Sequence, residues 1–470
     1  MGNGSDRNKP CACGSGKKYK KCCMGKKVTA PLEPFLTGNM AEDFLEFLSQ
    51  KTFLNPWVFR SPLYVSDGKE FSDVAIFFRD TLVLIEVKGN KFDPKNPQRY
   101  LKNAKDRHRQ LLKAKNIAEN RSKPVKFKNN YFEFETDFSE IKKIHLISLS
   151  TGQGEMELAM QSEGIDYSEL SFKDVSRYLG FWDPATEVHN FTASEFAFAS
   201  KHLDTLKDFL WYLDFEKKYL SNKFSLKEGQ SAVAIIDTHR EDLISLYVTT
   251  YYWDEDLNRT GVIDLNKIFG GASIDKADFV MYVGTNTRKS LEDDETYKQI
   301  KAEKKSSYLW DILVNDALSQ IASGHMVVSG SLEKKKIEPE ALKKVFEELS
   351  FTSRLDRVLF GEKIKDAEEK NLKFRNMFSD NQNNTTLFSY AHIEYDNFPT
   401  IEEQEDRVYE HLHFVWCRVK FGDKIEKFRE KIKKALLISK HTHKGKTAYV
   451  FVLSDELKVE ESLCREVGAI

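Results

Sequence analysis

Length and composition are those of a globular protein with more than one core. The chain has 470 residues, of which 40% are hydrophobic and 31% are charged, and these values are ordinary for a globular protein. We expect two sizeable domains and a small appendage, because a single core seldom grows to this size. No apolar run is long enough to cross a bilayer and no signal-peptide core stands near the N-terminus, so the pattern excludes a membrane protein and predicts a cytoplasmic one.

Charge is divided unevenly along the chain. The formal net charge of -1 combines a basic N-terminal part, with 26 Lys and Arg against 13 Asp and Glu up to Lys128, with an acidic remainder. A basic surface is typical of proteins that bind a polyanion such as nucleic acid. A solvated, lysine-rich surface balanced by the acidic half would give the same composition, and composition alone leaves both interpretations open.

The predicted elements of the N-terminal half follow the order α-β-β-β-α-β. Residues 1–27 are polar and basic without apolar periodicity, and residues 28–37 contain two prolines, as in a linker. Apolar residues at helical spacing predict helices, and alternating or continuous short apolar runs predict strands. The expected elements are a helix over 39–50, strands over 57–65, 72–78 and 81–88, a helix over 98–120 and a strand over 142–149.

The C-terminal half predicts a second α/β domain and carries no catalytic signature that we can identify. Residues 150–200 follow no clear pattern. Beyond them we expect helices over 203–220, 296–322, 338–349, 402–420 and 424–437, and strands over 231–236, 243–252, 279–283 and 448–453. We therefore divide the chain into a small module at 1–30, an α/β domain at 31–220 and a second α/β domain at 221–470. The last domain would regulate activity, sense a trigger or assemble the enzyme.

Two carboxylates and a lysine come together on one predicted hairpin. Its two strands join at Arg79 and Asp80, and antiparallel pairing about this turn places Asp73 opposite Glu86 with Cβ atoms roughly 5 Å apart. Glu86 and Lys88 leave the same face of their strand because they are two residues apart. The opposite face is purely apolar, with Val74, Ile76, Val83, Ile85 and Val87.

These residue types suit metal-dependent hydrolysis of a phosphodiester. Two facing carboxylates repel each other unless a cation lies between them, and Mg²⁺ binds one or two carboxylates together with phosphate and water oxygens. Such a metal lowers the pKa of a bound water, while Lys88 would orient the nucleophile or stabilise charge developing on the phosphate. A solvated surface hairpin is the alternative, because a bare D…ExK pattern also arises by chance.

The motif resembles a known nuclease superfamily. Ser72-Asp73, a gap of twelve residues and then Glu86-Val87-Lys88 are similar to the PD-(D/E)XK superfamily, which includes restriction endonucleases, with Ser72 in place of the motif's proline. The resemblance covers residues 38–150. It implies a restriction-endonuclease-like αβββαβ core, a Mg²⁺ or Mn²⁺ site at Asp73 and Glu86, and an endonuclease that cleaves DNA, in bacterial defence against foreign DNA. Many such enzymes pair their subunits, so a homodimer is our default expectation.

Two further site residues follow from this resemblance. Glu42, in the predicted first helix, looks like the superfamily's first-helix glutamate and would complete the metal site, with Asp43 and Glu46 as competitors. Gln110, on the second helix, resembles the glutamine that such nucleases place near the scissile phosphate. An exposed helix glutamine is an equally good interpretation of Gln110.

The second predicted helix has a basic face and an apolar stripe. Beside a phosphodiesterase site, we interpret the basic face as a nucleic-acid-binding surface, although a merely solvated helix face would look the same. Its residues are Lys102, Lys105, Arg109 and Lys113, and the stripe consists of Leu101, Ala104, His108, Leu111 and Ala118.

Four cysteines near the N-terminus predict a zinc site. Cys11, Cys13, Cys22 and Cys23 supply the four thiolates of a closed, tetrahedral structural zinc site, and metal would provide most of the folding free energy of so polar a segment. Residues 10–23 resemble a SEC-C motif. We expect a docking tag for protein or nucleic acid, and reactive or disulfide-forming thiols are the alternative.

A second group of potential metal ligands is better explained as structural residues. The histidine pairs 411/413 and 441/443, near Cys417, could hold a metal, but alternating histidines are more often structural.

Three functions remain open on the sequence alone. The first is the Mg²⁺-dependent DNA endonuclease. The second is an adaptor, whose zinc tag docks to a protein or ribosome and whose nuclease fold is an inactive platform. The third keeps the chemistry but takes RNA as the substrate.

Overall fold

A mixed α/β structure is described for just over half of the chain. The computed structural model describes residues 55–89, 97–151, 182–183, 185–223, 240–241, 243–244, 247–248, 298, 306–322, 327–329, 339–369, 375–379, 385–394, 400–421, 432–443, 446–455 and 459–466. Some sequence predictions lie outside these residues: the helix over 39–50, the strands over 231–236 and 279–283, Glu42 and the four zinc cysteines.

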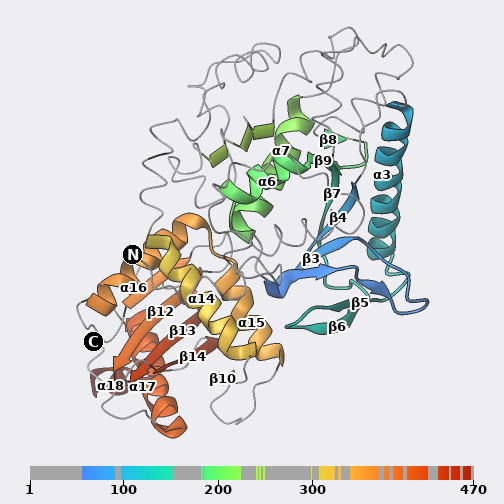
Figure 1. Ribbon diagram of the computed structural model, residues 1–470. Helices are drawn as coiled ribbons and strands as arrows, with labels where there is room; N and C mark the ends of the chain where they lie inside the picture. Colours follow the sequence, from blue (N-terminus) through green and yellow to red (C-terminus); the bar gives the residue numbers. More distant parts are fainter. Residues whose placement is uncertain are drawn as a thin grey trace, which may run out of the picture.

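The first sheet combines an antiparallel half with a parallel half (Figure 1). In the described residues its strand order is β1-β3-β4-β7-β9-β8, with β3 antiparallel to β1 and β4, and β7 parallel to β4 and β9. The strands are β1 (Val58–Arg60), β3 (Val74–Phe78), β4 (Thr81–Gly89), β7 (Lys143–Thr151), β8 (Trp182–Asp183) and β9 (Val188–Thr192). A short 3-10 helix, η2 (Asn55–Trp57), precedes β1, and a small sheet beside it contains β2 (Leu63–Tyr64), β5 (Val125–Lys128) and β6 (Glu133–Thr136).

The β3–β4 hairpin has the register that the sequence predicts. Val74 pairs with Ile85 and Phe78 pairs with Thr81. Arg79 adopts a φ of 52° in the turn between them. Asp73 immediately precedes the first pair, and the same register, extended by one residue, puts Asp73 across from Glu86.

Helices cover both faces of this sheet. Helix α3 (Pro97–Glu119) runs alongside β4 and β7 and makes the crossover that parallel strands require (Figure 1). On β9, Asn190 bonds to His108 of α3, whereas the adjacent His189 bonds to Glu216 of α7 (Leu206–Lys223). Because successive strand residues point to opposite faces, α3 and α7 lie on opposite sides of the sheet.

A capping box begins the helix that follows β9. Thr192 caps α6 (Ala193–His202) by accepting from the backbone N–H of Glu195, and the Glu195 carboxylate accepts from the backbone N–H of Thr192. This reciprocal pair satisfies two N–H groups that the first helical turn would otherwise leave without a partner. Neither β9 nor α6 is among the elements predicted from the sequence, because residues 150–200 follow no clear apolar pattern.

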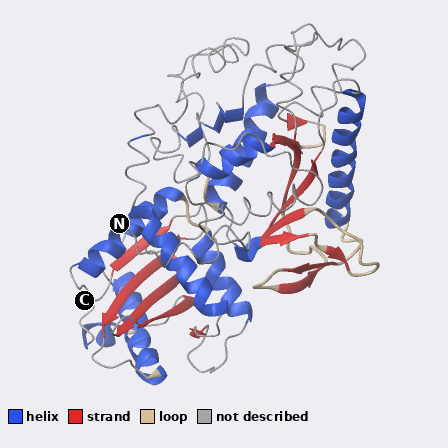
Figure 2. Ribbon diagram, in the orientation of Figure 1, coloured by secondary structure: helices blue, strands red, loops and turns tan. Residues whose placement is uncertain are grey.

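The second sheet lies between two layers of helices (Figure 2). Among the described strands its order is β10-β14-β13-β12-β11. The strands are β10 (Val327–Ser329), β11 (Arg375–Ser379), β12 (Thr385–Glu394), β13 (Ile432–His443) and β14 (Lys446–Asp455), and the helices are α14 (Ser307–Ala322), α15 (Pro339–Ser350), α16 (Arg354–Glu369), α17 (Ile401–Phe421) and α18 (Glu461–Glu466).

The central strand β13 is buried on both faces. Leu436 and Ile438 belong to the core that contains Trp310 of α14, whereas Leu437 belongs to the core that contains Trp416 of α17. The predicted helix over 424–437 is therefore wrong for residues 432–437. A strand buried on both sides has a continuous apolar run, which is hard to distinguish from a helix by periodicity.

The predicted strand over 243–252 is also wrong where the structure describes it. Leu243, Ile244, Tyr247 and Val248 are helical and buried. Tyr247 packs against Tyr212 of α7, with ring centroids 5.6 Å apart. The β-branched and aromatic composition favours a strand. The buried positions, however, recur at helical spacing, and packing against α7 stabilises the helix over the local preference for a strand.

The two sheets share one hydrophobic core at the β3–β4 hairpin. Trp57 donates its indole N–H to Ser350 Oγ at 2.7 Å, and Phe78 stacks on Phe351 with centroids 5.6 Å apart. Arg79 forms an ion pair with Glu348 of α15 at 2.8 Å. The hairpin that carries Asp73 and Glu86 is therefore anchored to the second sheet at its turn.

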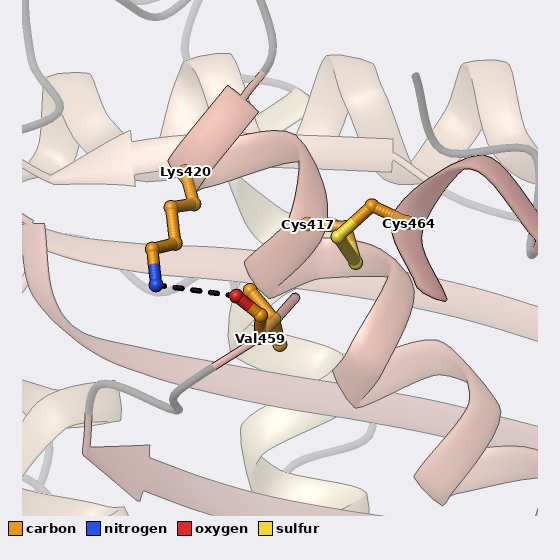
Figure 3. The surroundings of a disulfide bond; sticks show 4 residues. All are labelled: Cys417, Lys420, Val459 and Cys464. Atoms are coloured by element: carbon orange, nitrogen blue, oxygen red, sulfur yellow. Dashed lines mark hydrogen bonds between the residues drawn. A yellow bond between two sulfur atoms is a disulfide. The ribbon is translucent and has the colours of Figure 1, made fainter. Parts of the chain in front are cut away.

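A disulfide joins the last described helix to α17 (Figure 3). Cys417 and Cys464 are 47 residues apart in the sequence and fully buried. Nearby, Lys420 donates to the backbone carbonyl oxygen of Val459 at 3.2 Å (Figure 3). No helix in the described part of the chain is long and apolar enough to span a membrane.

Candidate functional site

Asp73 and Glu86 meet at the end of the β3–β4 hairpin. Both are buried, with 7% and 3% of their surfaces exposed. The Asp73 carboxylate accepts a hydrogen bond from the backbone N–H of Val87 at 2.7 Å, and its side chain also hydrogen-bonds to that of Glu86. The hairpin register thus brings together two acidic groups from its two strands.

Asp73 and Glu86 do not both ionise readily, because they are buried and close to each other. Burial raises the pKa of Glu86 well above its ordinary value, and the negative charge of Asp73 raises it further. Lys88 lowers the same pKa and Glu70 raises it, but neither reverses the direction. Without further positive charge, the buried pair therefore retains a proton at neutral pH.

Lys88 continues the polar row along β4. It is half-buried and lies two residues beyond Glu86, so both side chains leave the same face of the strand. In the parallel pairing with β7, Glu86 lies beside Ser148 and Lys88 lies beside Ser150. The three predicted residues Asp73, Glu86 and Lys88 therefore share one face near the carboxyl end of β4.

Helix α3 adds two buried polar side chains to this face. Arg107 donates its Nε–H to Ser148 Oγ at 2.9 Å, and His108 Nε2 lies 2.6 Å from Asn190 Oδ1. Both side chains are 2% exposed. Arg107 is not among the site residues that the sequence predicts, and helical periodicity places His108 in the apolar stripe. An Arg and a His at buried helix positions are the available signal.

Other residues predicted on α3 face solvent. Gln110, Lys102, Arg109 and Lys113 are exposed, and Lys105 is half-buried. Arg109 forms an ion pair with Asp106 at 3.0 Å. The structure therefore presents the basic side chains on the outer surface of α3, while all five stripe residues are buried as predicted: Leu101, Ala104, His108, Leu111 and Ala118.

Potential metal ligands are incomplete in the described part of the chain. No group of three His, Cys, Asp or Glu side chains gathers there closely enough to hold a metal ion. Asp73 and Glu86 supply two carboxylates, and Glu42, the third predicted ligand, lies outside the described residues, as do Cys11, Cys13, Cys22 and Cys23.

The histidine pairs near Cys417 do not form a metal centre among the described residues. Cys417 is joined to Cys464, and His411 Nε2 lies 2.6 Å from Ser389 Oγ. Burial lowers the pKa of His411 to about 3 and that of His441 to about 4. His411 and His441 are therefore neutral at pH 7 and buried in the core.

Comparison with known proteins identifies the N-terminal module. Residues 7–25 match the SEC-C motif, which confirms that prediction. A stretch of 47 residues is 51% identical to the uncharacterized protein YccF of Bacillus subtilis (strain 168), and this stretch covers 10% of the chain and 13% of that relative. No solved structure matches the chain.

Proposed function

We propose that the protein is a metal-dependent nuclease of the PD-(D/E)XK kind, with Asp73, Glu86 and Lys88 at its active site. The observation that carries the proposal is the burial of two mutually repelling carboxyl groups beside a lysine. A buried, repelling pair costs stability, and the repulsion that raises the pKa of Glu86 is the kind that a divalent cation relieves.

The order of the elements gives secondary support. Strands β1, β3 and β4 form an antiparallel meander, α3 crosses over, and β7 returns parallel to β4. This order agrees with the βββαβ part of the core that the sequence resemblance implies. The acidic pair lies on β4 and just before β3, where the resemblance expects it.

Each side chain has a distinct role in the proposed reaction. Asp73 and Glu86 would hold Mg²⁺ or Mn²⁺, with Asp73 kept in place by the N–H of Val87. When bound, the metal supplies positive charge at the phosphate and lowers the pKa of a water. Lys88 orients the attacking water or stabilises the negative charge that develops on the phosphate oxygens.

The neighbouring side chains hold this arrangement in place. Arg107 of α3 donates to Ser148, which lies beside Glu86 on the neighbouring strand β7, so this hydrogen bond fixes α3 against the strand next to Glu86. The exposed lysines of α3 would bind the phosphate backbone of the substrate without reading its bases. We take DNA as the substrate and retain the role in bacterial defence as part of the proposal, since both come from the resemblance alone.

The SEC-C module has a separate role in this proposal. Cys11, Cys13, Cys22 and Cys23 would bind one structural zinc ion and leave no ligand position open. The module would then dock the enzyme to a protein or to nucleic acid.

Cleavage assays test the proposal. Purified protein is incubated with plasmid, linear DNA and RNA, each with Mg²⁺, with Mn²⁺ and with a chelator. We expect cleavage of DNA that requires the metal, and a loss of at least about 100-fold in Lys88→Ala and Asp73→Ala, as when a group that stabilises the transition state is removed. Lys365→Ala is the matched control, because Lys365 is an exposed helix lysine of the second sheet's α16.

Each assay result has a definite meaning. Metal-dependent cleavage of RNA alone would assign the same site to a ribonuclease. Cleavage at the wild-type rate by either active-site variant, or no cleavage of any nucleic acid, would reject the proposed active site and favour the adaptor.

A further inference from the structure

A pocket lies at the opposite end of the first sheet from Asp73 and Glu86. Its volume is about 250 Å³, and it is lined by the end of α3, the loop before β7 and the start of β7, the turn before β9 and one residue of α7. The lining residues are Lys115, Ala118, Glu119, Arg121, Phe138, Ile141, Lys142, Lys143, Ile144, Glu187 and Lys217. Ile144 lines the pocket and Ser148, four residues further along β7, stands beside Glu86, so about 13 Å of strand separate the pocket from the proposed active site.

The pocket already stabilises one anionic group. Five of its lining side chains are cationic and two are carboxylates. Glu187 lies between two helices, 2.6 Å from Lys217 Nζ of α7 and 3.4 Å from Lys115 Nζ of α3. The hydrogen bond from Lys217 is the largest cause that lowers the pKa of Glu187, with further lowering by Lys115. The field inside the pocket therefore favours negative charge.

The remaining cations make solvent-exposed contacts with neighbouring residues. Lys142 pairs with Asp80 at 3.4 Å, and Lys143 pairs with Asp214 at 2.6 Å, all four side chains being at least one third exposed. Arg121 donates to the backbone carbonyl oxygen of Ser139 at 3.3 Å. Because exposed ion pairs contribute little free energy, these cations can leave their present partners and bind a ligand of higher negative charge.

Backbone geometry also marks the pocket. Three of its lining residues have a positive φ although none is glycine: Arg121 at 52°, Phe138 at 66° and Glu187 at 59°. The conformation of Arg121 ends helix α3, since the backbone N–H of Ser122 bonds to the carbonyl oxygen of Ile117. Phe138 and Glu187 lie in loops, where non-glycine residues of this conformation are uncommon and gather at functional sites. The apolar part of the lining includes Phe138, Ile141 and Ile144.

We propose that this pocket is a binding site for a diphosphate group, either free pyrophosphate or the end of a nucleotide. Five cationic side chains suit an anion of higher charge than the resident carboxylate, and lysine and arginine are the usual partners of phosphate oxygens. The volume is below the about 300–1,000 Å³ of pockets that enclose a whole drug-sized ligand, so a compact anion fits and a complete nucleotide would extend beyond it. The site does not depend on the proposed nuclease activity.

Calorimetric titration of the full chain tests this site. Pyrophosphate, ADP and inorganic phosphate are titrated separately at low salt without divalent cations. We expect saturable binding of one pyrophosphate, weaker binding of phosphate, and a loss of about tenfold in Arg121→Gln and in Lys217→Gln, since each removes a charge-assisted hydrogen bond. Glu187→Gln should change the affinity in the opposite direction and tighten binding severalfold, because the competing carboxylate is lost.

Matched controls separate the pocket from general electrostatics. Lys365→Gln and Glu369→Gln remove the same charges from an exposed pair on α16 and should leave the affinity unchanged. Among the described residues, Arg121 contacts the backbone of Ser139 and no ion pair between helices includes it, so Arg121→Gln should leave the fold intact; thermal melting checks this. ADP binding as tightly as pyrophosphate, with the same dependence on Arg121, would identify a nucleotide as the source of the diphosphate.

Three results would overturn the proposal. The first is the absence of saturable binding of pyrophosphate and ADP. The second is an equal effect of the pocket and control substitutions. The third is displacement of pyrophosphate by a short single-stranded oligonucleotide that depends on Arg121 and Lys217, which would assign the pocket to nucleic acid.

Discussion

The carboxylate of Asp73 accepts the backbone N–H of Val87 at 2.7 Å across the hairpin. Val87 lies between Glu86 and Lys88, so this hydrogen bond holds the three candidate active-site residues in one fixed arrangement. A backbone donor cannot rotate away as a side chain can. The bond therefore keeps the Asp73 carboxylate buried against Glu86 despite their repulsion.

Arg79 should contribute to the stability of the whole described structure. It pairs with Glu348, whose side chain is only 8% exposed, and its guanidinium lies 4.8 Å from the ring centroid of Phe351. We expect Arg79→Ala to lower the free energy of unfolding by about 2 kcal/mol, less than the loss of a fully buried pair because Arg79 is partly exposed. Urea denaturation measures this.

A matched arginine provides the control for Arg79. Arg465 pairs with Glu461 on the surface of α18, where the Arg465 side chain is 70% exposed, and Arg465→Ala should cost no more than about 0.5 kcal/mol. Equal losses in the two variants would show that the hairpin turn does not anchor one sheet to the other.

His411 should make stability fall in mild acid. Burial lowers its pKa in the folded protein to about 3, against an ordinary value of 6.5. Between pH 6.5 and 3 the unfolded chain binds a proton at this residue and the folded chain does not, so stability is lost as the pH falls, by about 1.4 kcal/mol per pH unit from this group.

The substitution His411→Asn isolates this contribution. Denaturation between pH 4.5 and 8 should show a shallower loss of stability in the variant below pH 6. Between pH 7 and 8 the two proteins should show the same slope, because His411 is neutral in both the folded and the unfolded chain. Parallel curves over the entire range would mean that His411 is protonated in the folded state.

The disulfide should stabilise the core between the second sheet and α17, which contains Trp416. Joining Cys417 to Cys464 closes a loop of 47 residues, and the loss of loop entropy in the unfolded chain is worth about 4 kcal/mol on the loop-length model. Reduction, or the double substitution Cys417→Ala and Cys464→Ala, should therefore lower the melting temperature. If a reducing agent lowers the melting temperature of the wild-type protein but not that of the double variant, the disulfide is the source of the stability. Identical melting of oxidised and reduced wild type would contradict this.

The arrangement within the hairpin was predictable because it depends on local rules. The turn at Arg79 and Asp80 fixes the register, and the two-residue period of a strand then places Glu86 opposite Asp73 and Lys88 on the same face. The burial of the α3 stripe followed in the same way from helical periodicity. No long-range information was needed for either.

Contacts between separate elements could not be predicted. The bond between Arg107 and Ser148 depends on how α3 docks on β7, and nothing in the sequence near either residue specifies it. The pairing of Cys417 with Cys464 likewise depends on α18 folding back against α17. β13 is buried on both faces, so its sequence lacks the alternation of apolar and polar residues that identifies a strand.

The cysteine module should bind one zinc ion per chain. Elemental analysis of purified full-length protein is expected to find close to one equivalent, with the loss of most of it in Cys11→Ser combined with Cys22→Ser, because a tetrahedral site tolerates few missing thiolates. The double substitution Cys417→Ala and Cys464→Ala is the control and should retain the metal. Zinc at the wild-type level in the N-terminal variant would place the metal elsewhere.

Binding of Mn²⁺ to the acidic pair tests the central claim most directly. Electron paramagnetic resonance of the zinc-loaded full chain counts bound Mn²⁺ without requiring any substrate. We predict a saturable site that is abolished or weakened by at least about tenfold in Asp73→Asn and in Glu86→Gln, and unchanged in Glu369→Gln. Occupancy by Mn²⁺ that is the same in all four proteins, or absent from the wild type, would contradict the assignment of Asp73 and Glu86 as metal ligands.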